Sequence, residues 1–433
     1  MSKFITVKLN ELAAPGRSVI SGPFGSNIGQ RFFKTHGVPI IRGNNLTTDF
    51  KKFNDDGFVF LTEEKADELK SDAIKGDILF TAAGTIGQVG MIPQSAKYDR
   101  YVISNKQLRF RVDPKKAEPD YVYYWLASPW IYKTIIDRNT GSTVPLINLG
   151  IIKSLPVSLP KDIIEQKKIA SVLANIDEKI VLNNRINTEL EAMAKTLYDY
   201  WFVQFDFPDA NGKPYKTSGG KMEYNATLKR EIPVGWNDSI LGEFIELERG
   251  VTYSKEDVKI QDNKDTIGVL RATNVTGNAV DIDDLVLIPS CKASTSQMLR
   301  KFDVLIVMSS GSKQHVGKNG VYYFEKPNAF GAFCSKITPN NKFRYFINTF
   351  LQSEWFKSYI NNQCMGTNIN NLTNTHITKC EIICPASDVV ELFENKMMPI
   401  YNKLASNTQE NSRLTKLREW LLPLLMNGQV TVK

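Results

Sequence analysis

Histidine and cysteine are scarce in this chain. Among 433 residues there are 3 histidines and 5 cysteines, and every cysteine lies in the second half. The histidines stand too far apart for an HExxH zinc motif, and an odd number of cysteines gives no complete disulfide framework. We therefore expect no metal on this chain, and reduced, buried thiols in a cytoplasmic protein.

Long apolar runs are absent as well. No stretch of about 18 apolar residues occurs, so we expect no membrane span. The opening MSKFITVKLN lacks the apolar core of a signal peptide. With 42% hydrophobic and 23% charged residues, the composition is typical of a globular protein, and the length suggests several domains. The net charge of +8 is compatible with basic surfaces but does not by itself establish nucleic-acid binding.

Familiar catalytic motifs are missing too. Neither the Gly-x-Ser-x-Gly elbow of hydrolases nor the Asn/Asp-Pro-Pro-Tyr tetrapeptide of adenine methyltransferases occurs. The stretch GSKQHVGKN (311–319) is not a phosphate loop, because Asn319 replaces the Ser or Thr that would hold magnesium and the glycine spacing is one residue too long. We predict a glycine-hinged loop that could enter a DNA groove, with a plain surface loop as the alternative. The sequence thus indicates no catalytic residues.

One long sequence pattern occurs twice. RGNNLT at 42–47 returns as RATNVT at 271–276, and GDILFTAAGTIGQVGMI at 76–92 returns in altered form at 302–323. A period of about 225 residues far exceeds that of solenoid repeats, so it indicates duplication of a whole module.

Each module combines short strands with an aromatic-rich helix. Runs such as VPIIR, DILFTA and KQLRFRV are bounded by Gly, Asn and Pro, which predicts strands, and helices are expected at 119–137 and 343–361. The fold class is therefore α+β. A stretch rich in Pro, Gly, Ser and Lys is expected to link the halves. The expected division is a first module at 1–160, a long helix at 161–206, a linker at 207–229, a second module at 230–386 and a second long helix at 387–433.

The two long helices carry the same heptad seam. Alternating steps of four and three residues meet apolar side chains over more than four heptads, with two asparagines in the middle of each helix. The seam consists of Ile169, Leu173, Ile176, Ile180, Asn183, Asn187, Leu190, Ala194, Leu197 and Trp201 in the first helix, and of Phe393, Met397, Ile400, Leu404, Asn407, Asn411, Leu414, Arg418, Leu421 and Leu425 in the second.

An antiparallel arrangement aligns the two seams. Asn183 then meets Asn411 and Asn187 meets Asn407, which makes a polar layer that fixes the register at some cost in stability. The seam would span about 48 Å at 1.5 Å per residue. The alternative is that each helix packs on its own module.

Three residues of the second helix interrupt the pattern. Arg418 occupies a seam position, and Leu417 could take its place. Proline removes an amide donor from a helix, so we expect a kink or restart at Pro399 and, because of Pro423, an end near Leu422.

Polar, glycine-hinged loops recur in parallel places of both halves. They are predicted at 21–27, 42–47, 81–88, 104–107 and 138–148 in the first half, and at 249–255, 271–276, 309–319 and 365–372 in the second. Arginine reads guanine, asparagine and glutamine read adenine, and Ser, Thr and Lys hold phosphates, although each loop could also be ordinary turn chemistry. The candidate DNA-contacting residues are Ser21, Phe24, Ser26, Arg42, Asn44, Asn45, Thr85, Gln88, Lys106, Arg138, Thr143 and Asn148 in the first half, and Arg249, Tyr253, Lys255, Arg271, Asn274, Ser312, Lys313, Gln314, His315, Lys318, Asn368 and Asn370 in the second.

Three further stretches carry a resemblance to a known family. KSLPVSLPKDIIEQKKIASVLANIDEKI (153–180) resembles the region after the first recognition domain of type I restriction–modification specificity subunits. REIPVGWNDSILGEF (230–244) resembles that family's opening of a second target recognition domain, and LREWLLPLLMNGQV (417–430) resembles its C-terminal ending. The second long helix departs from the pattern, because it lacks the Glu-Gln pair found at 165–166.

The resemblance implies a non-catalytic, sequence-specific DNA-binding subunit. Two similar target recognition domains, separated by two long antiparallel coiled-coil helices with internal pseudo-two-fold symmetry, would each recognise one half of a split double-stranded DNA site. Two methyltransferase subunits would dock on the helices, and endonuclease–translocase subunits would complete the complex. S-adenosylmethionine, ATP and magnesium would be bound by those partners. The residues alone leave two alternatives open, a self-sufficient nuclease with duplicated domains and a coiled-coil scaffold that does not bind DNA.

Overall fold

The chain folds into two compact units in the computed structural model, which describes residues 4–311, 313–363 and 371–432. Unit 1 comprises residues 1–181 and 413–433, and unit 2 comprises residues 182–412. Both predicted long helices therefore contribute a part to each unit. Within the described ranges, no helix has the length and apolar character needed to cross a bilayer.

Unit 1 is built on two four-stranded sheets. Their central strands are buried on both faces, which is why they are continuous apolar runs such as VPII and ILFT. One sheet has the order β2-β9-β6-β7 (Val19–Ser21, Gln107–Phe110, Ile78–Thr81 and Val89–Met91), and the other has the order β4-β3-β8-β5 (Phe60–Leu61, Val38–Ile41, Tyr101–Ile103 and Asp72–Ala73). The other elements are the pair β1 (Phe4–Lys8) and β10 (Pro156–Pro160), and the helices α1 (Glu63–Leu69), α2 (Pro119–Leu126), α3 (Pro129–Asp137) and α4 (Leu149–Lys153).

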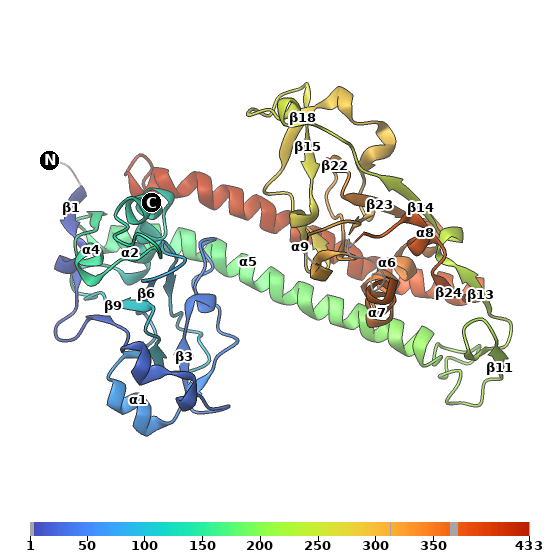
Figure 1. The fold of residues 1–433 in the computed structure, drawn as a ribbon, viewed down its shortest axis with the longest axis horizontal. Coiled ribbons are helices and arrows are strands. Elements are labelled where there is room, and N and C mark those ends of the chain that lie inside the picture. Colours follow the sequence, from blue (N-terminus) through green and yellow to red (C-terminus); the bar gives the residue numbers. More distant parts are fainter. Residues whose placement is uncertain (1–3, 312, 364–370, 433) are drawn as a thin grey trace. The chain divides into compact units, whose positions relative to one another are not determined.

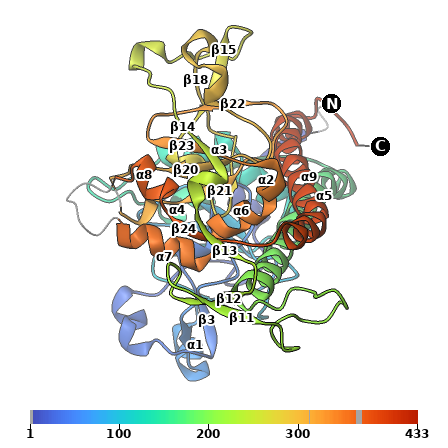
Figure 2. The same ribbon diagram turned by 90° about the vertical axis from the view of Figure 1, so that its right-hand side faces the viewer.

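Unit 2 repeats this plan. Its larger sheet has the order β14-β23-β20-β21-β17-β16 (Ile245–Arg249, Cys334–Pro339, Val304–Val307, Asn319–Val321, Ala279–Val280 and Val275–Thr276), and its smaller sheet has the order β18-β15-β22-β19 (Val286–Pro289, Thr266–Leu270, Asn328–Phe330 and Met298–Leu299). The other elements are the pairs β11–β12 (Met222–Asn225, Arg230–Pro233) and β13–β24 (Asn237–Ile240, Glu381–Cys384), and the helices α6 (Arg344–Gln352), α7 (Glu354–Gln363) and α8 (Asn374–Thr378). Helix α6 contacts β21 and β23 of the larger sheet (Figure 2).

The two units share one topology. In each, one sheet contains a parallel pair, β3 with β8 in unit 1 and β15 with β22 in unit 2, flanked by antiparallel neighbours. In each, the other sheet centres on an antiparallel pair, β6 with β9 and β20 with β23. The predicted duplication and the α+β fold class are confirmed.

Each aromatic-rich helix that was predicted as one is in fact two. Ser128 separates α2 from α3, and Ser353 separates α6 from α7, with extended backbones at ψ 152° and 151°. Each serine hydroxyl accepts a hydrogen bond from the amide three residues on, from Ile131 at 3.4 Å and from Phe356 at 3.2 Å. The expectation of continuous helices is wrong because a serine cap starts a new helix at the same point of both units.

Two long helices complete the fold, α5 (Ile163–Tyr198) and α9 (Ser387–Met426), and a π-helical turn at Asp199–Val203 extends α5. In each unit the α5 and α9 segments run side by side and antiparallel (Figures 1 and 2). Helix α9 continues through Pro399 and Pro423, so the restart expected at the first proline is wrong. Each proline removes only one amide donor, and tertiary packing of the buried face keeps the helix intact.

The end of α9 also differs from the expectation. The helix was expected to end near Leu422, but it ends at Met426. The stop is made by Gly428, which has a φ of +70° and donates its amide to the carbonyl oxygen of Leu425 at 3.2 Å. A glycine in the left-handed region just past a helix is the usual C-terminal cap.

The segment predicted as a linker is folded. Phe207 is buried and stacks on Tyr215 and on Trp236, with ring centroids 4.7 and 4.9 Å apart. The last part of the segment forms β11. The sequence hid this arrangement, because aromatic stacking needs no periodic pattern.

The cysteines within the described ranges carry free thiols. Cys334 and Cys380 are buried, and burial raises the pKa of each thiol to about 12. Cys291 is exposed, so the expectation of buried thiols is wrong there.

Candidate nucleic-acid interface

The first predicted loop of unit 1, at 21–27, lies against the loop at 104–107. The amide of Gly22 donates to the carbonyl oxygen of Gln107 at 2.9 Å. A Cβ on Gly22 would stand 1.8 Å from the carbonyl oxygen of Ser104, so only glycine allows this approach. In the same loop, 83% of the surface of Phe24 is exposed to solvent.

Gln88 joins two further loops. Its Nε2 donates to the carbonyl oxygen of Leu46 at 2.9 Å, and its Oε1 accepts from Thr81 Oγ1 at 2.8 Å. The predicted loops at 42–47 and 81–88 are therefore held together by a side chain that we had expected to face DNA. Both polar atoms of this amide are already bonded within the protein.

Ala82 connects the remaining loops of unit 1. Its amide donates to the carbonyl oxygen of Lys106 at 2.7 Å, and its carbonyl oxygen accepts from the amide of Ile147 at 2.8 Å. This brings the loops at 104–107 and 138–148 to the loop at 81–88. The five loops predicted in the first half of the sequence thus form one connected surface.

Arg42 and Asn45 close the chain segment that follows β3, residues 42–57, which we call the first excursion. The amide of Arg42 donates to Oδ1 of Asn45 at 2.9 Å, and Nη2 of Arg42 donates to the carbonyl oxygen of Gly57 at 2.9 Å. Nδ2 of Asn45 donates to the carbonyl oxygens of Asn54 and Asp56 at 2.8 and 3.0 Å. The two side chains tie both ends of the excursion together.

Unit 2 contains the same closure in residues 271–284, the second excursion. The amide of Arg271 donates to Oδ1 of Asn274 at 2.8 Å, and its Nη2 donates to Oδ2 of Asp284 at 2.6 Å. Nδ2 of Asn274 donates to the carbonyl oxygen of Asp284 at 3.2 Å. The repeated Arg-x-x-Asn pattern therefore has a structural explanation in both units.

This closure corrects two of the predicted DNA contacts. Asn45 and Asn274 are buried, with 0% and 3% of their surfaces exposed, and their amides bond to their own excursions. The expectation that they face a base edge is wrong, because the sequence cannot show whether a loop asparagine bonds outward or to its own backbone. Arg42 and Arg271 are half-buried and use one guanidinium nitrogen in the same way.

The loops of unit 2 meet around residues 331–334, GAFC, which the sequence analysis did not single out. The amide of Gly331 donates to the carbonyl oxygen of Leu270 at 2.8 Å, next to the second excursion. The carbonyl oxygen of Phe333 accepts from the amides of Met308 and Ser309 at 2.9 and 3.2 Å. The predicted loop that begins at 309 is fixed to this segment.

Phe333 is a candidate contact that sequence reasoning missed. Its side chain is 69% exposed, although its carbonyl oxygen holds two amides. It precedes Cys334, the first residue of β23, as Lys106 precedes Gln107, the first residue of β9. Counting back from the equivalent strand would have found it, but GAFC has none of the polar residues that we searched for.

Most other predicted contacts have exposed side chains, and a few do not. The exposed ones are Ser21, Phe24, Ser26, Asn44, Thr85, Lys106, Thr143, Asn148, Arg249, Lys255, Gln314, His315 and Lys318, whereas Gln88, Arg138 and Tyr253 are half-buried. Lys313 begins a 3-10 turn, and Ser312, Asn368 and Asn370 lie outside the described residues. Arg138 bonds to Ser154, and Asn148 caps α4.

The exposed set suits duplex DNA. Lys106 in unit 1 and Arg249, Lys255 and Lys318 in unit 2 are cations that could neutralise phosphates. Hydroxyl and amide side chains beside them can hydrogen-bond to base edges. Among the residues that the structure describes, no three His, Cys, Asp or Glu side chains gather in a way that could hold a metal ion.

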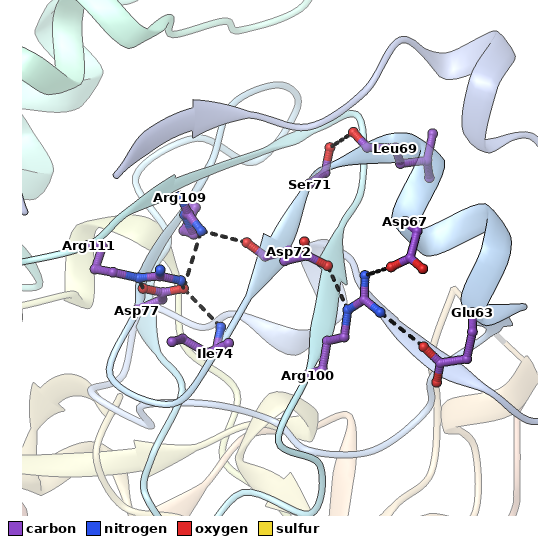
Figure 3. A network of polar contacts seen from close by, with 10 residues as sticks. All are labelled: Glu63, Asp67, Leu69, Ser71, Asp72, Ile74, Asp77, Arg100, Arg109 and Arg111. Carbon is purple, nitrogen blue, oxygen red and sulfur yellow. Dashed lines mark hydrogen bonds and ion pairs between the residues drawn. The ribbon is translucent and has the colours of Figure 1, made fainter. Parts of the chain in front are cut away.

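A network of ion pairs and hydrogen bonds joins the two sheets of unit 1 (Figure 3). Arg109 of β9 is 4% exposed, and its Nη1 donates to the carbonyl oxygen of Asp72 in β5 at 2.7 Å. Nε and Nη2 of Arg111 donate to the two carboxylate oxygens of Asp77, the residue before β6, at 2.6 and 2.8 Å. Lys336 of unit 2 contacts the carbonyl oxygen of Met298 in the same way, at 3.3 Å. Cations that are paired in this way leave little charge for DNA.

The predicted helix seam is closed to solvent. Every seam residue is buried or half-buried, and Trp201 lies 5.5 Å from Phe393 between ring centroids. Nδ2 of Asn183 donates to Oδ1 of Asn411 at 2.9 Å, and Nδ2 of Asn407 donates to Oδ1 of Asn187 at 2.9 Å. The asparagines thus meet in the antiparallel register that the sequence predicts.

Arg418 does not break the seam. It is 5% exposed, and its Nη1 bonds Oδ1 of Asp177 in α5 at 2.6 Å. The other carboxylate oxygen of Asp177 accepts from the hydroxyl of Tyr124 at 2.6 Å. Leu417 is 41% exposed, so the expectation that it takes the seam position is wrong. A buried arginine is tolerated here because a carboxylate faces it.

Comparison with known proteins identifies related chains. Residues 29–192 and 233–416 each match the family model described as the type I restriction modification DNA specificity domain. A type I restriction enzyme MjaIX specificity subunit from Methanocaldococcus jannaschii is 25% identical over 361 residues, covering 83% of this chain and 78% of that protein. The HindI specificity subunit from Haemophilus influenzae is 24% identical, covering 82% and 87%. The fold resembles the crystal structure of a type I restriction–modification system S subunit from M. genitalium, with a TM-score of 0.57 and 16% identity over 98% of this chain and 96% of that one.

Proposed function

This chain belongs to the type I restriction modification DNA specificity domain family and is a specificity subunit, and we propose that each of its two units recognises one half of a split DNA target. The observation that carries this proposal is the duplication of the loop surface on one topology. A chain that reads two different half-sites needs two scaffolds that are alike and two loop sets that differ. Lys106 of unit 1 corresponds to Phe333 of unit 2, which is a difference of this kind.

The paired helices are the second part of the proposal. Residues 163–181 of α5 belong to unit 1 and residues 182–198 belong to unit 2, and α9 is divided in the same manner. We propose that the two helices set the number of unread base pairs between the half-sites. Their exposed faces would dock two methyltransferase subunits, and endonuclease–translocase subunits would join that complex.

The chemistry is assigned to the partners. We propose that the methyltransferase subunits bind S-adenosylmethionine and methylate an adenine in each half-site, and that the endonuclease–translocase subunits use ATP and magnesium. This chain would supply specificity without a catalytic centre of its own. The cytoplasm, where chromosomal DNA is accessible to such a complex, is the expected location.

The test is a methylation map. DNA exposed to this chain with its cognate methyltransferase should carry modified adenines in one asymmetric sequence made of two half-sites and a spacer of constant length. A map without two half-sites, or cleavage or methylation by the purified chain alone, would contradict the proposal.

A further inference from the structure

The tip of the first excursion is fastened to α9. Nη2 of Arg418 donates to the carbonyl oxygen of Asp49 at 3.4 Å, and its guanidinium carbon lies 4.6 Å from the ring centroid of Phe50. The remaining nitrogen contact, to Asp177, anchors the same side chain to α5. One arginine of the helix pair therefore holds a loop whose base is closed by Arg42.

The backbone of Phe50 adopts a strained conformation that its contacts stabilise. It has a φ of +63°, a left-handed conformation that is strained for a residue with a side chain. Its carbonyl oxygen accepts from the hydroxyl of Tyr123 at 3.2 Å. Contacts with Arg418 and Tyr123 thus select one conformation of the tip, which would otherwise relax.

Unit 2 reaches the same result with different residues. Counted from the central asparagines, Arg418 in α9 corresponds to Ala194 in α5, so the equivalent position carries no cation. Ala194 instead lines a hollow of about 220 Å³, together with Glu191 and Asn278. Nδ2 of Asn278 donates to Oε2 of Glu191 at 2.9 Å. Asn278 follows Gly277, whose φ of +62° places it at the tip of the second excursion.

The two contacts are exchanged between the halves of the chain. The tip of the first excursion meets α9, which follows the second recognition domain in the sequence, and the tip of the second excursion meets α5, which follows the first. We propose that Arg418 and Glu191 are positioning residues for DNA recognition, each orienting the reading excursion of one unit from a helix of the other half of the chain. This inference rests on the proposed function and adds to it a role of the helices in base discrimination.

The physical reason is preorganisation. Each excursion is closed at its base by an Arg-Asn pair and is joined to its sheet by backbone bonds, from Met91 to the carbonyl oxygen of Lys52 and from Val321 to the carbonyl oxygen of Asn278. The contact with the long helix adds a hold on the tip itself. A loop that is ordered before binding loses less entropy on DNA, and its base contacts are then made in one geometry only. Loosening a tip should therefore reduce discrimination at one half-site more than it reduces overall DNA binding.

The experiment uses the full chain assembled with its methyltransferase and follows methylation rates on three duplexes. One carries the mapped target, one has a single base pair changed in the half-site read by unit 1, and one has a change in the other half-site. Arg418→Met should reduce discrimination at the first half-site by about tenfold, within the range that one mismatched pair usually costs. Discrimination at the second half-site should stay unchanged.

A companion variant separates positioning from folding. Arg418→Met leaves Asp177 buried without its cation, which lowers stability. Combining it with Asp177→Asn removes that charge and keeps an acceptor for Tyr124, so Tm should recover. Discrimination at the first half-site should remain low in the double variant, because the contacts with Asp49 and Phe50 are still missing. Recovery of discrimination together with Tm would overturn the inference.

The second unit supplies the reciprocal test. Glu191→Ala and Asn278→Ala should each reduce discrimination at the second half-site only, and the double variant should be no worse than either one, because both remove the same contact. Lys115→Ala and Lys213→Ala, at exposed positions outside both long helices and outside the predicted loops, are the controls and should leave both half-sites unchanged. Equal losses at both half-sites, or none at either, would refute the positioning role while the mapped two-part target still supported the proposed function.

Discussion

Asn183 donates its side-chain amide to Oδ1 of Asn411 at 2.9 Å, in the middle of the helix pair. Replacing Asn183 alone by leucine should lower the free energy of unfolding by about 1–3 kcal/mol, because Oδ1 of Asn411 loses the amide that donates to it. Urea denaturation of the variant measures this loss.

The paired replacement should behave differently. Replacing Asn183, Asn187, Asn407 and Asn411 together by leucine removes both polar pairs from the seam and should recover most of the stability, but it also removes what fixes the register. Chromatography with light scattering should then show mixed oligomers. A single species of unchanged size would argue against a register role for the asparagines.

Arg42→Met and Arg271→Met should each change the recognition of one half-site. Each arginine closes one excursion through its Nη2, to Gly57 in unit 1 and to Asp284 in unit 2. Removal of the bond should loosen that excursion and permit methylation at variants of one half-site. A methylation map of each variant gives the answer, and relaxed recognition at both half-sites would contradict it.

Lys106→Ala should weaken DNA binding in a salt-dependent manner. Lys106 is exposed on the loop surface of unit 1, and loss of one phosphate contact should reduce the slope of log K against log salt by about 0.9. Titrations at several salt concentrations measure the slope. Lys213→Ala, at an exposed position remote in sequence from the predicted loops, is the matched control and should leave the slope unaltered.

Changing the length of both helices should change the spacer of the target. One heptad adds about 10 Å of helix at 1.5 Å per residue, which corresponds to roughly three base pairs of duplex. We expect a heptad inserted into both α5 and α9 to lengthen the unread spacer while leaving the half-sites as they were. The same spacer in the new methylation map would rule out the helices as the measure of distance.

Stability should fall between pH 4.5 and 7 because of Glu394. Burial raises the pKa of this carboxyl group to about 7, although it accepts the amides of Phe346 and Tyr345 at the start of α6. A raised pKa means that the folded protein keeps the proton when the unfolded chain has already lost it. The stabilisation by protonated Glu394 is therefore fully present below about pH 4.5 and is lost as the pH rises towards 7. The free energy of unfolding should fall by at most about 3 kcal/mol over this range. Glu394→Gln should flatten this part of the curve of unfolding free energy against pH.

The helix pair could be predicted because its signal is periodic. Apolar residues at heptad spacing specify a seam, and two asparagines in each seam specify one register, so Asn183 and Asn411 could be matched before any coordinates. The pairing of Arg418 with Asp177 could not, since Asp177 lies outside the seam and nothing local links the two.

The loops were harder to predict for a different reason. Loop residues such as Asn45 and Lys106 look alike in a sequence, yet one is buried in its own excursion and the other is exposed. The direction of a polar side chain depends on which backbone carbonyls lie within reach, and for Asn45 these belong to residues nine and eleven positions away. Phe333 escaped notice because an exposed aromatic residue carries no polar signature.

Each excursion tip contacts the long helix that follows the other recognition module in the sequence. This arrangement limits how recognition modules can be transplanted between proteins. A foreign first module grafted onto this chain would bring its own loop tip but would find the α9 of the host. The loop tip of a grafted first module would have to contact Arg418 of the host in place of the helix residue of its own protein. The loop tip of a grafted second module would have to contact Glu191. Compatibility of a hybrid would then depend on a few side chains at a distance from the join, and chimaeras designed with matched tips should retain the selectivity of their donors.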